Sequence, residues 1–180
     1  TMRFNENLAA LEFYTGVEWR AVNSYVDMGN RGRGVFAGRH SPTFLATIDY
    51  IQIPTLGNAV SFGDLTDGVQ ARAGGYSNGH RGVFCGGSKP GFTDDCDYIT
   101  IQSAGNGIDF GNLGTAKDFV SSASSSTRGI TAGGRSGSPA TAQNSIEYVQ
   151  IATRGDHLDF GDLAEATHIA APGSSPTRMV

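Results

Sequence analysis

The feature that most constrains the fold of this chain is an eighteen-residue segment that occurs three times in similar form. It reads IDYIQIPTLGNAVSFGDL at 48–65, CDYITIQSAGNGIDFGNL at 96–113 and IEYVQIATRGDHLDFGDL at 146–163. Self-similarity at a fixed period is typical of repeat proteins, whose units are stabilised by packing against their neighbours. The 180 residues are therefore interpreted as a short array of repeats that share one core.

Three anchors define the repeat. The first is an arginine before glycine that opens an apolar segment: Arg33, Arg81 and Arg128, spaced 48 and 47 residues apart. The second is an acidic residue before tyrosine: Asp49, Asp97 and Glu147. The third is a phenylalanine before glycine: Phe62, Phe110 and Phe160. The acid and the phenylalanine are always 13 residues apart, whereas the arginine and the acid are separated by 16, 16 and 19. This pattern predicts a rigid hairpin preceded by a variable loop.

Each repeat is predicted to contain four short strands. In the first repeat they are 33–37, 48–53, 59–65 and a weaker segment within 70–78. Apolar residues on both faces of the second strand predict burial on both faces. The turns between the second and third strands contain Gly-Asn or Gly-Asp, which are strong hairpin signals. The small residues of the fourth segment, and of its counterparts at 119–125 and 168–174, suit either a strand or a loop.

The predicted fold class is all-β, built of kelch-like β-propeller-type repeats. Four-stranded units of 47 to 50 residues with a closing glycine doublet are typical of propeller blades. The units are 33–80, 81–127 and 128–177 within a repeat region of 29–177, and 178–180 resembles the start of a fourth.

The number of repeats is awkward for a closed propeller, which needs at least about four blades. Three explanations compete. The chain is part of a longer protein, its terminal strand closes onto the first unit or a neighbouring subunit, or the three sheets form a β-prism. The first is favoured, because the last three residues stop within a predicted strand.

Residues 1–28 do not follow the repeat and are predicted to form a small β-meander that docks on another surface. Their pattern, RFN at 3–5 and LEFYTGVEW at 11–19, resembles a module of tail-fibre and other virion structural proteins of tailed bacteriophages. The repeats are similar to kelch-like repeats in virion proteins of marine and cyanobacterial phages. Two departures occur: Gly38-Arg39 replaces the glycine doublet in the first repeat, and Thr131 replaces phenylalanine in the third.

This resemblance implies a component displayed on the exterior of the virion after assembly in the host cytoplasm, with host attachment as its role. It implies other virion proteins and a host-surface glycan or protein receptor as partners. It also implies a homo-oligomer, with a trimer favoured. A soluble kelch-type adaptor that recruits a protein partner is the alternative function, and a propeller glycan hydrolase is the third.

The loops that vary between repeats, 39–47, 88–95 and 135–145, are the predicted binding surface. Their aromatic side chains, with Tyr76 nearby, suit stacking on sugars or contact with a protein. The candidate contact residues are Arg39, His40, Phe44, Lys89, Phe92 and Arg135. The anchors are instead predicted to be structural. Because the arginine and the acid lie at opposite ends of a hairpin, the arginine is expected to find its partner in another strand or unit.

No catalytic, cofactor or metal site is expected, and the chain is not expected to be an enzyme. The four histidines lie at unrelated repeat positions without metal-ligand spacing, and no nucleophile signature is present. The two cysteines, Cys85 and Cys96, occupy positions that hold alanine or isoleucine in the other repeats. They are predicted to be buried thiols rather than a disulfide, although antiparallel strands would bring them together.

Charge and hydropathy exclude two further partner classes. The net charge is −4 and no block of lysine and arginine occurs, so binding to nucleic acid is not expected. No run approaches the roughly 20 apolar residues of a membrane-spanning helix, so membrane insertion is not expected either.

Overall fold

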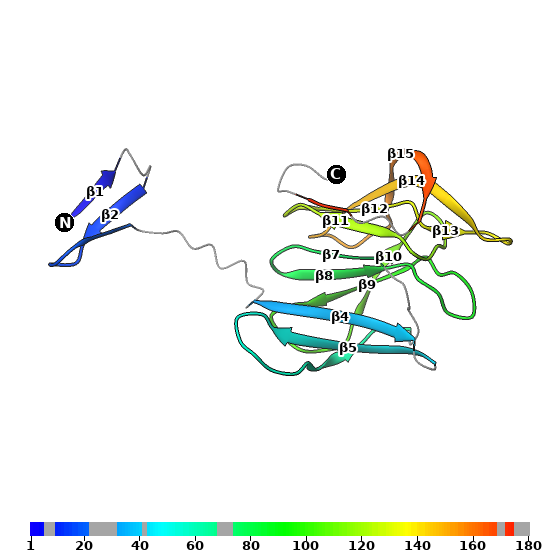
Figure 1. Cartoon of the computed structure of the whole chain (residues 1–180), viewed down its shortest axis with the longest axis horizontal. Helices are drawn as coiled ribbons and strands as arrows, with labels where there is room; N and C mark the ends of the chain where they lie inside the picture. Colours follow the sequence, from blue (N-terminus) through cyan, green and yellow to red (C-terminus); the bar gives the residue numbers. More distant parts are fainter. Residues whose placement is uncertain (6–9, 22–31, 41–42, 68–73, 169–171, 175–180) are drawn as a thin grey trace.

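The computed structural model describes residues 1–5, 10–21, 32–40, 43–67, 74–168 and 172–174. Within these residues the chain is all-β, as predicted, and strands β1 to β15 form four antiparallel sheets (Figure 1). None of the four sheets closes on itself. In the part of the chain that the structure describes, no helix is long and apolar enough to cross a membrane.

The first sheet is a meander of β1 (Met2–Asn5), β2 (Ala10–Tyr14) and β3 (Trp19–Ala21). Its own side chains hold it together. Arg3 Nε donates to the buried Glu12 carboxylate at 2.9 Å, and the Arg3 guanidinium lies 4.1 Å from the Trp19 ring. The residues of the N-terminal motif therefore form the internal packing of the meander.

The repeats form the other three sheets. The first consists of β4 (Arg33–His40), β5 (Phe44–Gln52) and β6 (Val60–Asp64). The second consists of β7 (Gly74–Ser77), β8 (Arg81–Cys85), β9 (Asp95–Thr100) and β10 (Ile108–Asn112). The third consists of β11 (Ser121–Ser124), β12 (Arg128–Ala132), β13 (Arg135–Ser136), β14 (Thr141–Gln150) and β15 (Leu158–Thr167).

The weak fourth segment of the first and second repeats is a strand where it is described, and it pairs with the following repeat. Gly74 of β7 faces Cys85 of β8, and Ser121 of β11 faces Ala132 of β12. The second and third sheets therefore each combine the last strand of one repeat with strands of the next, three in the second sheet and four in the third, where the short β13 is added. Of the third counterpart, 168–174, residues 169–171 lie outside the described residues, and the others belong to no named strand.

Successive sheets are joined by the same backbone contact, used twice. The glycine turn of one repeat docks on the Phe-Gly strand of the preceding repeat: Gly105 N donates to Phe62 O, and Gly155 N donates to Phe110 O, both at 2.8 Å. A Cβ on Gly111 would lie 2.4 Å from Gly155 O. Only glycine allows this approach, and the φ of +139° at Gly111 also favours it.

The acidic anchors join the sheets as well. The buried Asp97 accepts hydrogen bonds from Thr66 N at 2.9 Å and from Thr66 Oγ1 at 2.6 Å, across the first junction. At the second junction, the buried Glu147 accepts from Gly114 N at 2.9 Å and from Lys117 Nζ at 2.8 Å. Because a buried carboxylate is unfavourable unless its oxygens are paired, these contacts determine how each repeat sits on its predecessor.

Each arginine anchor contacts its own sheet, and Arg33 and Arg81 also contact the next one. Each guanidinium lies over the tyrosine of the adjacent strand, at 4.7 Å for Arg33, 4.6 Å for Arg81 and 5.1 Å for Arg128. Arg33 also donates to Ile101 O at 2.6 Å, and Arg81 donates to Ala152 O at 2.9 Å. The partners of Arg33 and Arg81 are thus a ring on the adjacent strand and a carbonyl of the following repeat, in another strand and another unit as predicted.

The core lies between the sheets. One buried cluster joins the first and second repeats through Ile48, Phe62, Leu65 and Ile99. The other joins the second and third sheets, and its buried members are Tyr76, Val83, Cys85, Cys96, Phe110, Leu113, Val120, Val149 and Ile151. Each sheet thus buries apolar surface against the next one, as expected for repeats that are not stable alone.

Candidate functional site

The predicted binding loops lie at one end of the stacked sheets. Figure 1 shows the C-terminal end of β4, the loop after β8 and the turn after β13 at this end. Two of the three predicted loops are shorter than expected, because strand pairing continues into them. Arg39 pairs with Leu45 and His40 with Phe44, so most of 39–47 is a strand hairpin. Likewise, β13 pairs with the start of β14 within 135–145.

Lys89 lies in the remaining loop and is held by two carboxylates. Its ammonium contacts Asp67 of the first repeat, and it donates to Asp95 Oδ2 at 2.5 Å. Thr93 Oγ1 donates to the same Asp95 oxygen. Because its charge is already paired, Lys89 is better suited to connecting the first two repeats than to gripping a ligand.

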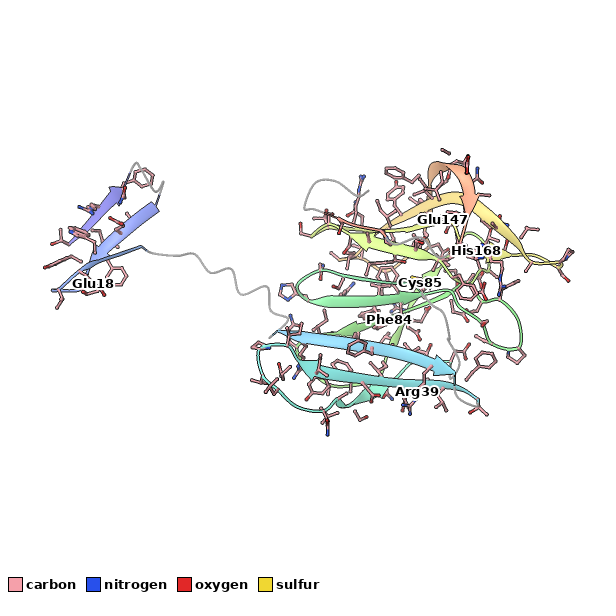
Figure 2. All side chains as sticks on the ribbon, viewed as in Figure 1. Glu18, Arg39, Phe84, Cys85, Glu147 and His168 are labelled. Atoms are coloured by element: carbon pink, nitrogen blue, oxygen red, sulfur yellow. The ribbon has the colours of Figure 1, made fainter. Side chains whose placement is uncertain are left out.

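Two predicted residues from different repeats, Phe92 and Arg135, come together in what we call the aromatic–arginine cluster, completed by Phe119 and His168. The Arg135 guanidinium lies 4.8 Å from the Phe119 ring and 5.9 Å from the Phe92 ring. The ring of His168, labelled in Figure 2, lies 6.2 Å from that of Phe119. Phe119 and His168 were not predicted, because nothing in their own repeats distinguishes them.

Arg135 is fixed in place by a buried carboxylate. Its Nε donates to Asp118 Oδ1 at 3.1 Å and its Nη2 donates to Asp118 Oδ2 at 2.9 Å, in a bidentate pair. The next residue, Phe119, has a φ of +52°, in the left-handed region that non-glycine residues rarely adopt. Such strained positions are common at binding sites, where the surrounding structure maintains them.

A second group of polar residues is buried in the core between the second and third repeats, and we call it the thiol–imidazole cluster. Cys85 of β8 and Cys96 of β9 face each other in register, and both thiols are free and buried, as predicted. His157 reaches them from the glycine turn of the third repeat, with Nε2 3.8 Å from Cys85 Sγ and Nδ1 3.8 Å from Cys96 Sγ. Tyr76 of β7 completes the cluster, its hydroxyl 2.8 Å from His157 Nε2.

The environments of the two thiols differ. Burial favours the neutral thiol of Cys85, but hydrogen bonds to Cys96, His157 and Tyr76 outweigh it and lower the pKa of Cys85 to about 6. Burial raises the pKa of Cys96 above its ordinary value. Burial also opposes the charged form of His157, yet its contact with Cys85 raises the pKa of the imidazole. Cys85 is therefore the more acidic of the two thiols, because its neighbours stabilise its charged form.

Sequence reasoning placed Tyr76 near the binding loops and treated His157 as an ordinary loop residue, and the structure corrects both. They are 6% exposed and lie in the core, because the third repeat docks on the second at this point. A signal was present in the sequence, since each member of the cluster replaces a small or aliphatic residue of the other repeats. The replaced residues are Ala123 for Tyr76, Ala37 and Ala132 for Cys85, Ile48 and Ile146 for Cys96, and Ala59 and Gly107 for His157.

Comparisons with known proteins identify no family for this chain: no family model matches it, and no curated protein sequence matches it significantly.

Proposed function

We propose that the chain is a structural and adhesive element of a virion appendage of the tail-fibre kind, built of kelch-like β-propeller-type repeats. The observation that carries the adhesive part is the aromatic–arginine cluster, in which Phe92 and Phe119 of the second repeat flank Arg135 of the third. The resemblance of the N-terminal motif and of the repeats to phage virion proteins supports the appendage part.

The chemistry of the aromatic–arginine cluster suits a sugar or a protein surface. Aromatic faces stack on the apolar faces of sugar rings, and a guanidinium donates hydrogen bonds to hydroxyl or carboxylate groups. Asp118 already holds the Arg135 guanidinium, so a ligand would meet a side chain that has little conformational freedom left to lose. Preorganisation of this kind favours binding rather than stability alone.

The expected partners follow from this proposal. They are a host-surface glycan or protein at the loop end and other virion proteins elsewhere, with the protein on the particle exterior and a trimer as its favoured assembly. A soluble adaptor is the second candidate function. Light scattering distinguishes the two, because an appendage predicts a stable trimer or higher assembly and an adaptor predicts a monomer.

The adhesive role is tested by measuring binding of the labelled full chain to a glycan array and to intact bacterial cells. The double variant Phe92→Ala/Arg135→Ala should bind at least about tenfold more weakly, as expected for residues at the centre of a binding surface. Leu56→Ala is the matched control, since Leu56 is a fully exposed apolar side chain in the turn that follows β5. Equal binding by the double variant and the control would rule out an adhesive role for this cluster.

A further inference from the structure

The thiol–imidazole cluster has the composition and the dimensions of a metal site. One ligand atom from each of Cys85, Cys96 and His157 can be chosen so that all three lie within 4.8 Å of one another. The residues are 0%, 1% and 6% exposed. Cys85, labelled in Figure 2, lies inside the stack, in the core between the second and third repeats. Two sulfurs and one imidazole nitrogen form a ligand set that suits Zn²⁺.

The imidazole is already oriented for this role. His157 Nδ1 lies 3.2 Å from the backbone carbonyl oxygen of Asn112, an acceptor, so the proton is best placed on Nδ1. The lone pair then belongs to Nε2, the atom that faces Cys85 Sγ and the Tyr76 hydroxyl. Histidine ligands of metals commonly donate their second ring nitrogen to a backbone carbonyl in this way.

The departures from the repeat provide an independent argument. Tyr76, Cys85, Cys96 and His157 come from four separate segments of three repeats, and each stands where another repeat has a small or aliphatic residue. All four converge on one buried point. Packing alone does not require this, because the equivalent region of the first junction is filled by apolar side chains such as Ile48.

We propose that Cys85, Cys96 and His157 bind a Zn²⁺ ion, with the Tyr76 hydroxyl beside the fourth coordination position. The two thiol protons leave to solvent on binding, and the two thiolates balance the charge of the ion, so a neutral unit is buried. The ion connects β8 and β9 to the turn of the third repeat. It therefore acts as a structural clamp at the second junction, whereas the described contacts of the first junction are apolar contacts, hydrogen bonds and the ion pair of Lys89 with Asp67.

The test uses the full chain, purified under reducing conditions, stripped with a chelator and titrated with Zn²⁺ or Co²⁺. One ion per chain should bind, and Co²⁺ should produce the intense near-ultraviolet absorption of thiolate coordination. Zn²⁺ at a hundredfold excess over its Kd should raise Tm by about 5–10 °C. Cys85→Ala and His157→Ala should abolish these changes, while His80→Ala, at an exposed histidine, should retain them.

The wild-type titration decides the proposal even if the core variants do not fold. Reduced wild-type protein that gives neither the cobalt band nor a change in Tm would overturn it. A Cys85–Cys96 disulfide that persists under reducing conditions would also overturn it, as would a cobalt band that survives in a folded Cys85→Ala variant.

A different observation supports a second inference. It concerns the two outer faces of the stack, which are the uncovered faces of the first and third repeats. Phe62 and Phe110 are 3% and 1% exposed because the next repeat covers them, whereas Phe160 is 54% exposed. Conversely, Ile101 and Ile151 are 5% and 0% exposed, whereas Ile53 in the first repeat is 66% exposed. The molecule thus presents the two halves of its internal junction separately, one at each end.

The polar contacts show the same division among the described residues. Nothing lies within 4 Å of a Cβ built on Gly161, although Gly63 and Gly111 are each covered by a docked turn. Arg128 is exposed, whereas Arg33 and Arg81 are partly buried and donate to the following repeat. Asp49 is only partly buried, in contrast to Asp97 and Glu147. Each feature is present, but no neighbouring repeat among the described residues uses it.

We infer that a second copy of this chain docks head to tail on the first. The turn at 57–58 of one copy would receive the Phe160–Gly161 strand of the other through the same backbone contacts that join the repeats internally. Arg128 would donate to the carbonyl of Ile53, and Asp49 would accept from the N–H of Ala164, which are the equivalent positions of the internal junctions. Such a heterologous contact produces a ring if the rotation closes and a filament if it does not.

Two variants with complementary defects test this inference. Ile53→Asp damages one face and Phe160→Asp damages the other, so each variant alone should remain monomeric while the wild type associates as its concentration rises. An equimolar mixture should form a one-to-one dimer, because each variant retains one intact face. A wild type that is monomeric at every concentration measured by light scattering would overturn the inference. So would a mixture that stays monomeric, since that result indicates a self-complementary contact.

Discussion

The second and third repeats contain the same third anchor in opposite surroundings. Phe110 is 1% exposed and packs in the core with Val149 and Ile151 of the next repeat, whereas Phe160 is 54% exposed. In both repeats the anchor lies beside the tyrosine of its own sheet, with ring centroids 6.0 Å apart. The difference teaches that each hairpin forms its own local contacts, but burial, and hence most of the stability, comes from the following repeat.

The largest difference in stability between covered and uncovered repeats is expected at the acidic anchors. Glu147→Ala should lower the free energy of unfolding by about 3–5 kcal/mol, because it leaves the fully buried Lys117 ammonium without its carboxylate. Asp49→Ala is the matched control at the same repeat position and should cost about 1 kcal/mol or less. Urea unfolding of both variants measures the difference. The double variant Lys117→Met/Glu147→Leu should recover much of the loss, and its failure to do so would contradict this explanation.

The phenylalanine anchors test the apolar part of the comparison. Phe110→Ala should destabilise the protein by about 3–5 kcal/mol, because it removes a fully buried ring and leaves a cavity. Phe160→Ala should cost about 1 kcal/mol or less when measured at a dilution that keeps the chain monomeric. Equal losses in chemical unfolding would mean that Phe160 is covered in solution.

Alanine substitutions at the glycines that follow these phenylalanines separate two costs. One is the strain of the backbone, and the other is the clash of a Cβ with the docked turn. Gly111 and Gly161 have φ values of +139° and +137°, so alanine should cost about 1–2 kcal/mol at either position. Gly111→Ala should cost about 1–3 kcal/mol more, since its Cβ would lie 2.4 Å from Gly155 O. The difference between the two Tm values isolates the contribution of the docked turn, and identical values would show that the turn can move away.

The arginine anchors should give the smallest effect. Arg81→Ala removes both the contact with Tyr98 and the hydrogen bonds to the next repeat, which together are worth about 1–2 kcal/mol. Arg128→Ala removes the contact with Tyr148 and should cost about 0.5–1 kcal/mol. If thermal unfolding showed the larger loss for Arg128→Ala, the proposed role of the carbonyl partners would be wrong.

The parts of the fold that the sequence predicted are those controlled by near neighbours in the chain. The prediction of a hairpin at 48–65 was correct, because the glycine turn and the residues of the two flanking strands favour this hairpin locally. The prediction of a loop at 39–47 was wrong, since pairing between β4 and β5 continues past a bulge after Ala37. The fourth strand was ambiguous because the small residues of β7 and β11 carry little signal until the next repeat provides a pairing edge.

The candidate sites also depend on contacts between residues that are far apart in the chain, which the sequence did not predict. Phe92 and Arg135 were identified singly from the variable loops, but their contact through Arg135 depends on how the third repeat sits on the second. His157 was set aside because it has no metal-ligand spacing along the chain, where it lies 61 residues from Cys96 and 72 from Cys85. Spacing along the sequence detects ligands that share one element, and this cluster draws on two strands and a docked turn.

The sequence by itself determined the repeat, its hairpin and the residues that must be glycine or aromatic within it, because these depend on contacts a few residues away. Only the tertiary structure decided which copy of each anchor is buried and which side chains meet. The physical reason is that burial belongs to a pair of neighbouring repeats. Identical residues, such as Phe110 and Phe160, therefore differ wherever one has a neighbour and the other does not.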